Sequence, residues 1–273
     1  MLIEALQGGF SSFNFQQFIV RLLLSIPPFL LALSVHEAAH AWMANRCGDP
    51  TARYLGRLTL NPLAHVDPIG FAMLFIVGFG WAKPVPVNPN NFRHYRRDDV
   101  KVSLAGITAN LMMFVIGCLL MFGMIAFALS KVPANAWMDG AFAVRVGGVR
   151  YGISISEAFL YGTSMGDYLV GPFLGAIPSY LFEMITIFTT INLVLAVFNL
   201  IPVPPLDGYH VLNDLVLRRQ LFAPQRAAMV GQIVLIALIF SGALDRVLSA
   251  VIGGALTGAG TAFEMLFRTL HII

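Results

Sequence analysis

Long apolar runs separated by short polar segments dominate the chain. Four such runs cover Ile19–Ala44, Leu104–Leu129, Tyr180–Leu200 and Met229–Leu244. A helix rises about 1.5 Å per residue and a bilayer core is about 30 Å thick, so long apolar runs are typical of membrane spans. The stretch 248–273 is apolar but rich in glycine, and the pattern leaves open whether it is a fifth crossing or a surface helix. The pattern predicts an all-α polytopic membrane protein with about four to six transmembrane helices.

Two shorter segments depart from this pattern. The apolar stretch Ile69–Trp81 is about 13 residues long, which is too short to span a bilayer unaided. We therefore expect a re-entrant, β-hairpin-like segment near residues 69–90, shielded by protein or water. In the mixed region 131–177, Val144 and Val146 alternate with other residues before a Gly-Gly pair, which favours a short hairpin.

Composition supports the membrane assignment and sets limits on function. Apolar residues make up 58% of the 273 residues and charged residues 11%, whereas soluble domains carry about 25% charge. The net charge of +3 is too weak and too dispersed for a nucleic-acid partner. No internal repeat is visible, so we expect a single membrane-embedded domain over residues 1–273.

The distribution of basic residues predicts an orientation. Residues 45–103 carry eight Lys and Arg and residues 207–226 carry three, against three in residues 131–177. If the 69–81 segment enters and leaves the bilayer on the same side, both basic regions share one face, and the positive-inside rule makes that face cytoplasmic. The N-terminus is then expected outside.

The sequence His36-Glu37-Ala38-Ala39-His40 closes the first apolar run. On a helix, residues four apart share a face, so both imidazoles can bind one metal ion while Glu37 lies beside them as a general base. Zinc prefers such ligands, and catalytic zinc sites use three protein ligands and a water. The alternative is a pair of helix-capping histidines at the membrane surface, but ionisable groups this deep in a span are usually functional.

Asp207 is the best candidate for the third ligand. It follows the third apolar run behind Pro202, Pro204 and Pro205, which force an extended approach, and Gly208 then permits a tight turn. An Asp that caps the next helix is the alternative. Competing ligands are His65, Asp67 and His210, none of which has a comparable setting.

Together these motifs resemble the site-2 protease family of intramembrane zinc metalloproteases. The similar elements are HEAAH, the Asn199–Gly208 segment and Gly106–Asn110, in which Ile107 stands where proline is common. The resemblance covers about Ile19 to Leu212, taken as the catalytic core, with additional membrane helices in 213–273. It implies one zinc ion per chain, zinc-assisted amide hydrolysis with Glu37 as general base, and Asn110 beside the zinc and the substrate. We expect a compact form, because 131–177 is too short for an inserted PDZ domain and no CBS domain is expected after the last span.

The proline-rich segment Trp81–Asn88 suggests how an unwound substrate could be held. Pro84 and Pro86 remove amide donors from one edge of an extended strand, whereas Val85 and Val87 leave the other edge complete. We hypothesise that the Val85/Val87 edge binds substrate by strand addition. A rigid proline-rich surface turn is the alternative.

The function predicted is an intramembrane zinc endopeptidase that cleaves a single-span membrane protein in regulated intramembrane proteolysis, with the lipid bilayer as its surroundings. The short form suggests a bacterial or archaeal plasma membrane, with the active site toward the cytoplasm. A transporter or metal carrier that uses the same intramembrane residues is one alternative, although such folds typically show two related halves. A catalytically inactive scaffold is the other.

Overall fold

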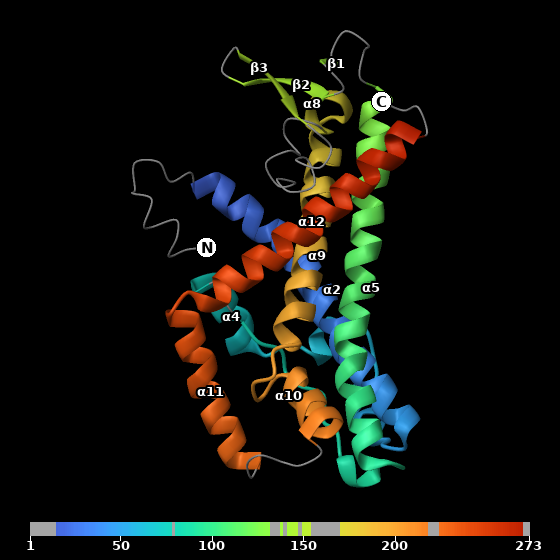
Figure 1. The fold of residues 1–273 in the computed structure, drawn as a ribbon, viewed down its shortest axis with the longest axis vertical. Coiled ribbons are helices and arrows are strands. Elements are labelled where there is room, and N and C mark those ends of the chain that lie inside the picture. Colours follow the sequence, from blue (N-terminus) through green and yellow to red (C-terminus); the bar gives the residue numbers. More distant parts are fainter. Residues whose placement is uncertain are drawn as a thin grey trace. The chain divides into compact units, whose positions relative to one another are not determined.

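The structure is a computed structural model that describes residues 15–77, 80–131, 137–138, 141–146, 149–153, 170–217 and 224–269. The described residues are mainly helical, as predicted (Figure 1). They fall into two compact units, the first formed by Met1–Met112 with Leu195–Ser241 and the second by Met113–Val194 with Gly242–Ile273. Helices α5 (Tyr95–Leu129) and α9 (Ala176–Asn199) contribute to both units.

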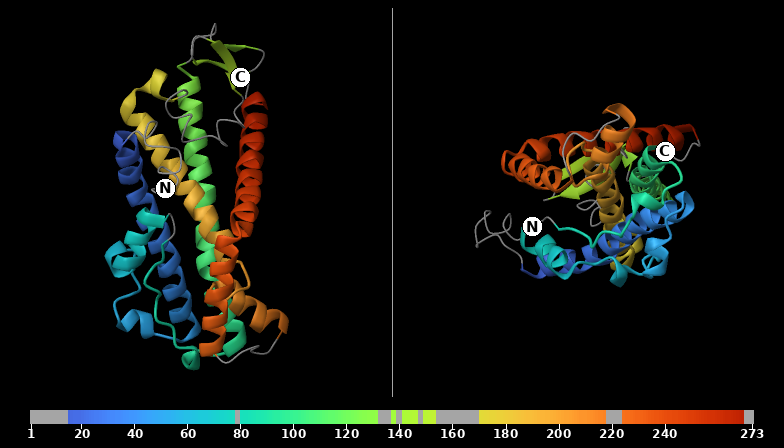
Figure 2. Two further views of the ribbon diagram at one scale, coloured as in Figure 1. Left: turned by 90° about the vertical axis from the view of Figure 1, so that its left-hand side faces the viewer. Right: turned by 90° about the horizontal axis from the view of Figure 1, so that it is seen from below.

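In the first unit, the C-terminal half of helix α2 (Phe15–Cys47) lies beside the first turns of α5 (Figures 1 and 2). Ala44 and Cys47 of α2 pack against Val102 of α5 in one buried cluster. Small side chains let these helices approach closely, which is how membrane helices usually pack. Helix α2 continues through Pro27 and Pro28 without interruption.

The segment between α2 and α5 contains an apolar helix whose two flanking stretches lie side by side. It contains α3 (Thr51–Tyr54), a 3-10 turn (Pro62–Ala64) and α4 (Pro68–Val77), and a 3-10 turn at Pro89–Asn91 precedes α5. An isolated antiparallel bridge joins Val66, before α4, to Ala82, after it. The two ends of the apolar segment therefore meet, as expected of a re-entrant path. Its apolar part is a helix and not a pair of strands, so only the hairpin-like course of the prediction is confirmed.

The second unit holds a buried apolar core. Phe122 of α5 stacks on Phe263 and Phe267 of helix α12 (Ala243–Thr269), with ring centroids 4.5 Å apart in each pair. Thr189 of α9 lies so close to Gly117 of α5 that a Cβ at position 117 would collide with it. A short helix, α8 (Gly171–Leu174), precedes α9.

The hairpin predicted in 131–177 is present. Strands β2 (Ala141–Val146) and β3 (Val149–Ile153) pair antiparallel, and β1 (Trp137–Met138) adds a third strand on the other side of β2. The Gly-Gly pair between β2 and β3 lies outside the described residues.

Four described helices are long and apolar enough to cross a membrane, within the predicted range. They lie at Phe18–Cys47, Tyr95–Leu129, Ala176–Asn199 and Ala243–Thr269. The run predicted at Met229–Leu244 is not among these four: helix α11 (Pro224–Phe240) has a shorter apolar part, Met229–Phe240, so the predicted end at Leu244 is wrong. Gly242, with φ of 66°, separates α11 from α12, and Leu244 belongs to α12. The undecided stretch after residue 248 is thus part of a helix long enough to span.

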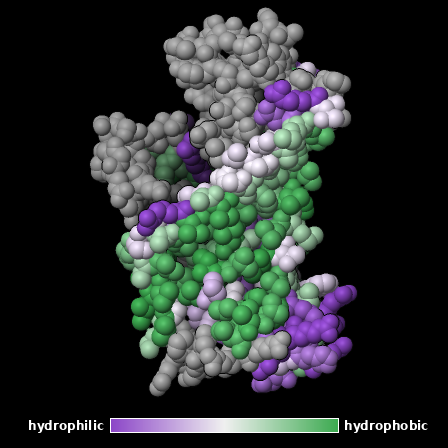
Figure 3. Space-filling view, in the orientation of Figure 1, coloured by the Kyte–Doolittle hydropathy of each residue, from purple (hydrophilic) through white to green (hydrophobic). Residues whose placement is uncertain are grey.

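Helix α11 carries exposed apolar side chains, which Figure 3 shows as hydrophobic surface. Its Gly231 lies against the backbone of Pro204, where a Cβ would collide with the Pro204 carbonyl. The loop that precedes Asp207 is thus packed against α11.

Candidate metal centre

Helix α2 brings His36, Glu37 and His40 together near its C-terminal end. The three side chains are buried, with 6%, 8% and 8% of their surfaces exposed. The two imidazole rings lie one helical turn apart and meet edge to face, with centroids 4.5 Å apart. The spacing of the sequence motif therefore places both histidines on one face, as predicted.

Asp207 completes a three-residue group with these histidines. Its Oδ2 lies 3.3 Å from His40 Nε2 and 3.5 Å from His36 Nε2, and the two Nε2 atoms are 3.0 Å apart. Asp207 is the first residue of α10 (Asp207–Val211), and Leu206 is the N-cap, so the alternative of a capping Asp is not what the structure shows. Among the described residues, this is the one group of three or more His, Cys, Asp or Glu side chains placed to hold a metal ion.

The donor atoms of this group fit a zinc ion. His40 Nδ1 lies 2.7 Å from the Val102 carbonyl oxygen and donates to it, which leaves the Nε2 lone pair of a neutral ring facing the cluster. Asp207 Oδ2 is buried and accepts no hydrogen bond within the described part of the chain. A buried acceptor is costly unless it has a partner, and zinc binds imidazole nitrogen and carboxylate oxygen. His36, His40 and Asp207 would hold the ion.

Position 208 requires glycine because neighbouring backbone leaves no room for a Cβ. A turn with positive φ, which the sequence suggested, is not the reason. A Cβ at this position would meet the backbone of Leu200 and Ile201, which come before the proline-rich loop. Helix α10 is thereby folded back onto the end of α9. This contact places Asp207 at the beginning of α10, facing the two histidines.

Glu37 points toward residues 83–88, which follow α4 without helix or strand and are called the extended segment. Its Oε2 accepts a hydrogen bond of 2.8 Å from the backbone N–H of Val85. The Val85 side chain is buried against Ala41 and Ala52, and Val87 packs partly against the same cluster. The extended segment therefore lies against α2, with the Val85 amide directed to the carboxylate.

Helix α5 covers the histidines with Gly106. A Cβ at Gly106 would collide with His40 Nε2 and lie 2.6 Å from His36 Cε1. Sequence reasoning noted the Gly106–Asn110 motif without assigning a role to its glycine, because the need for a missing side chain depends on the neighbouring helix.

Asn110 lies one turn after Gly106 and is fully buried. Neither its side-chain oxygen nor its nitrogen has a hydrogen-bond partner among the described residues. Residues four apart share a face of a helix, so Asn110 follows Gly106 along the face directed to α2. A buried amide without partners is ready to bind a polar ligand.

Asp49 and Arg57 hold the extended segment in place. The buried Asp49 carboxylate accepts hydrogen bonds from the Asn88 N–H at 2.7 Å and from Asn91 Nδ2 at 2.8 Å. Arg57 Nη2 donates to the carbonyl oxygen of Lys83 at 2.6 Å. Burial raises the pKa of Asp49, but hydrogen bonds from Thr51, Asn91 and Asn88 outweigh it and lower the pKa below its usual value.

The three competing ligands lie apart from the metal group. His65 Nε2 donates to the Thr59 carbonyl oxygen at 2.8 Å. Asp67 Oδ1 accepts from the N–H groups of Ile69 and Gly70 and so caps the start of α4. His210 Nδ1 lies 3.0 Å from Asp99 Oδ2 of α5.

Sequence reasoning missed Asp49 and Asp99. Asp49 follows Gly48 and precedes Pro50, a pattern typical of turns, which was a usable signal. Asp99 lies 111 residues from His210, and nothing in the local sequence indicates their contact.

The chain is similar to one peptidase family and to two bacterial proteins named as zinc metalloproteases. The family model described as "Peptidase family M50" matches residues 25–242, which include His36, His40 and Asp207. The Bacillus subtilis protein named "Putative zinc metalloprotease YwhC" is 36% identical over 198 residues, covering 71% of each chain. The similarly named Rip2 of Mycolicibacterium smegmatis is 28% identical over 229 residues, covering 82% of this chain and 69% of the relative. No solved structure matches the chain.

Proposed function

This chain belongs to peptidase family M50 and is a membrane zinc metalloprotease, and from that premise we propose that it cleaves a transmembrane segment of a single-span membrane protein. The observation that carries the proposal is the position of His36, Glu37 and His40. They are buried in a helix long enough to span a bilayer, and Asp207 faces the histidines. A metal ion held by these residues would act on peptide bonds within or close to the bilayer.

One zinc ion per chain is proposed, held by His36, His40 and Asp207. Bound there, zinc supplies Lewis-acid chemistry that lowers the pKa of water and polarises a carbonyl. Glu37 is the general base: its carboxylate accepts the proton of the attacking water and passes it to the leaving amine. While Oε2 binds the Val85 N–H, this hydrogen bond keeps the carboxylate beside the metal ligands.

Substrate binding is assigned to Asn110 and to the Val85/Val87 edge. The unpartnered, buried Asn110 amide supports contact with a substrate carbonyl or amide. A transmembrane helix must be unwound before it is cut, because its amides are hydrogen-bonded to each other. In an extended segment, the N–H groups of alternate residues point to the same side. Because the Val85 N–H donates a hydrogen bond to Glu37, the Val85/Val87 edge is the one that faces this carboxylate.

The setting proposed for this reaction is regulated intramembrane proteolysis at the cytoplasmic side of a bacterial or archaeal plasma membrane. The excess of Lys and Arg in 45–103 and 207–226 supports the orientation, and both named relatives are bacterial.

The test is Glu37→Gln in the purified full chain. Loss of a general base lowers a rate by about 100-fold to 10,000-fold. We expect zinc content to stay unchanged while chelator-sensitive cleavage of single-span substrates falls by at least about 100-fold. Bound zinc is measured by elemental analysis and cleavage by the appearance of the cut fragment. A Glu37→Gln protein that cleaves at the wild-type rate, or a wild-type chain without zinc and without cleavage, contradicts the proposal.

A further inference from the structure

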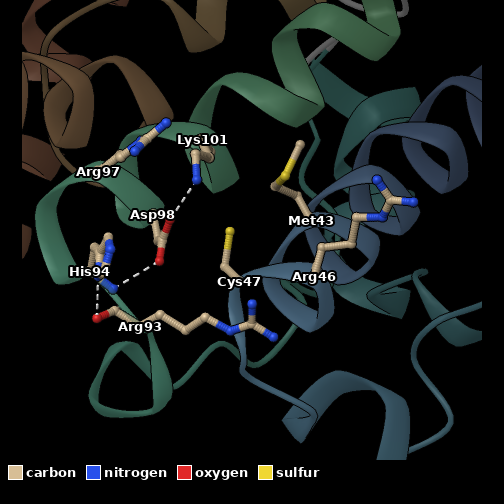
Figure 4. A pocket seen from close by; sticks show the side chains of 8 residues that line it. All are labelled: Met43, Arg46, Cys47, Arg93, His94, Arg97, Asp98 and Lys101. Carbon is tan, nitrogen blue, oxygen red and sulfur yellow. Dashed lines mark hydrogen bonds and ion pairs between the residues drawn. The ribbon is translucent and has the colours of Figure 1, made fainter.

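A cavity of about 400 Å³ lies between the end of α2 and the beginning of α5, away from the metal ligands (Figure 4). Four of its lining side chains are basic, Arg46, Arg93, Arg97 and Lys101, and one, Asp98, is acidic. Met43 and Cys47 supply apolar surface, and His94 completes the lining. We name this cavity the basic pocket.

The wall of the basic pocket is fixed by backbone contacts. The Arg93 N–H donates to the Cys47 carbonyl oxygen at 3.1 Å, and Phe92 is buried against Cys47 and Val102. Gly48 has φ of 112°, and a Cβ there would lie 2.9 Å from the Asn91 carbonyl oxygen. The chain before α5 is therefore held against the last turn of α2, and this contact sets the spacing of the basic side chains.

The basic pocket has more positive charge than its one carboxylate can neutralise. Asp98 is buried and already accepts from Lys101 Nζ at 2.7 Å and from the His94 N–H at 2.9 Å (Figure 4). Among the residues that the structure describes, no carboxylate forms an ion pair with Arg46, Arg93 or Arg97. Three guanidinium groups thus remain for an anionic ligand. Guanidinium groups bind phosphate oxygens through paired hydrogen bonds, so phosphate is the matching chemistry.

The position of the basic pocket indicates where that phosphate comes from. The first candidate span ends at Cys47 and the second begins at Tyr95, so the pocket lies at neighbouring ends of two candidate spans. Trp42 is 46% exposed, and the Arg46 guanidinium lies 4.6 Å from the centre of its ring. Tryptophan is enriched at the level of lipid headgroups, and long basic side chains extend to the same level. Basic pockets between membrane helices bind anionic headgroups.

We propose that the basic pocket binds the phosphate of an anionic phospholipid headgroup. Arg93 and Arg97 bind the phosphate, Arg46 adds positive charge from its place over Trp42, and Met43 supplies apolar surface for the beginning of the acyl chains. The Lys101–Asp98 pair fixes the base of the pocket. The bound lipid joins α2 to α5 next to the segment that carries Val85. This proposal does not depend on protease activity.

The experiment measures the apparent Kd of the full chain, purified in an uncharged detergent, for phosphatidylglycerol and for phosphatidylcholine by native mass spectrometry. The pocket variant is Arg93→Gln with Arg97→Gln, which keeps the Lys101–Asp98 pair. The matched control is Arg53→Gln with Lys83→Gln, which removes the same charge from exposed positions outside the pocket. Each basic residue contributes to anionic-lipid binding, so we expect the pocket variant to weaken phosphatidylglycerol binding by about 30-fold. The control is expected to change it by less than about threefold.

Inorganic phosphate, added as a competitor, separates the two sources of the anion. The proposal is supported if phosphatidylglycerol binds the wild type more tightly than the pocket variant and if millimolar phosphate does not displace it. If millimolar phosphate displaces the lipid from the wild type and this effect is absent in the pocket variant, the site binds free phosphate. That result overturns the lipid assignment. Equal losses in the two variants, or equal Kd values for the two lipids, overturn the site.

Discussion

Gly106 shows how a residue without a side chain can be part of a metal site. A Cβ at this position would enter the space of His40 Nε2 and lie 2.7 Å from His40 Cε1. The histidines cannot move away easily, because His40 Nδ1 is held by the Val102 carbonyl and both rings are buried. The short contact between α2 and α5 is therefore a requirement of the site and not only of helix packing.

Gly106→Ala is predicted to damage the metal site more than the fold. Overpacking of a buried contact costs about 1–3 kcal/mol, and displaced histidines are expected to weaken zinc binding by at least about tenfold. Zinc affinity is measured by competition with a chromophoric chelator, and stability by thermal unfolding. Gly123→Ala, on the same helix with no atom within 4 Å of the added Cβ, is the control. Equal zinc affinities for the two variants would refute this role of Gly106.

His210 and Asp99 join α10, which carries Asp207, to α5. The Asp99 carboxylate accepts a hydrogen bond from His210 Nδ1, which raises the pKa of His210. Burial lowers this pKa, but the negative charges of Asp99, Asp207 and Asp214 raise it further. Because the pKa is raised in the folded state, protonation of His210 favours folding. The stabilisation is complete below the unfolded value of about 6.5 and is lost as the pH rises through the raised pKa.

His210→Gln is expected to remove this pH dependence. The free energy of unfolding of wild type minus that of His210→Gln should be largest below about pH 6.5 and should shrink at alkaline pH. The difference is expected to be small, because half of the His210 side chain is exposed to solvent. Chemical unfolding of both proteins across the pH range measures it. A difference that stays constant with pH would show that the pair does not titrate in this way.

At the scale of elements, the extended segment before α5 joins the loop after α2 to the carboxylate of Glu37. Asp49 and Arg57 fix its two ends, and Val85 contacts Glu37 between them. None of these contacts is a regular strand pair. Its shape is set by side chains of the preceding loop and helix.

Val87→Pro separates strand addition from positioning of Glu37. Proline at this position removes a donor from the Val85/Val87 edge but leaves the Val85 N–H that binds Glu37. We expect at least about a tenfold loss of cleavage with unchanged zinc content, since one lost hydrogen bond in a desolvated site costs about 1–3 kcal/mol. Val87→Ala, which keeps the N–H, is the control. If Val87→Pro cleaves like Val87→Ala, the edge does not bind substrate.

At the scale of the whole molecule, the four candidate spans predict a topology. If α2, α5, α9 and α12 cross the bilayer and the 69–81 segment does not, residues 45–103 lie inside and the end of α12 lies outside. A crossing by α11 as well would place the end of α12 inside. The side on which α12 ends therefore decides whether α11 spans.

Cysteine labelling tests this topology in intact cells and in inverted vesicles. Arg53 and Thr269 are exposed, and the native cysteines, Cys47 and Cys118, are buried. We expect a membrane-impermeant maleimide to label Arg53→Cys in inverted vesicles only and Thr269→Cys in intact cells only. Labelling of Arg53→Cys from outside would reverse the orientation, and labelling of Thr269→Cys only in inverted vesicles would add a fifth crossing.

Much of the architecture follows from local sequence. The runs at Ile19–Ala44, Leu104–Leu129 and Tyr180–Leu200 correspond to helices, because apolar length alone predicts a span. The predicted end at Leu244 is wrong, since apolar content does not change at the break between α11 and α12. That break depends on one glycine with positive φ, Gly242, and hydropathy does not register backbone conformation.

The sequence by itself determined the membrane class and the shared face of His36 and His40, because helical periodicity and apolar length are local properties. It ranked Asp207 first among several candidates for a third ligand. Only the tertiary structure decided that Glu37 receives the Val85 amide, 48 residues away, that Val102 fixes His40, 62 residues away, and that Gly106 leaves room for both rings. These contacts join segments that are distant in the sequence. They depend on how closely the helices approach, which the spacing of residues along one helix does not encode.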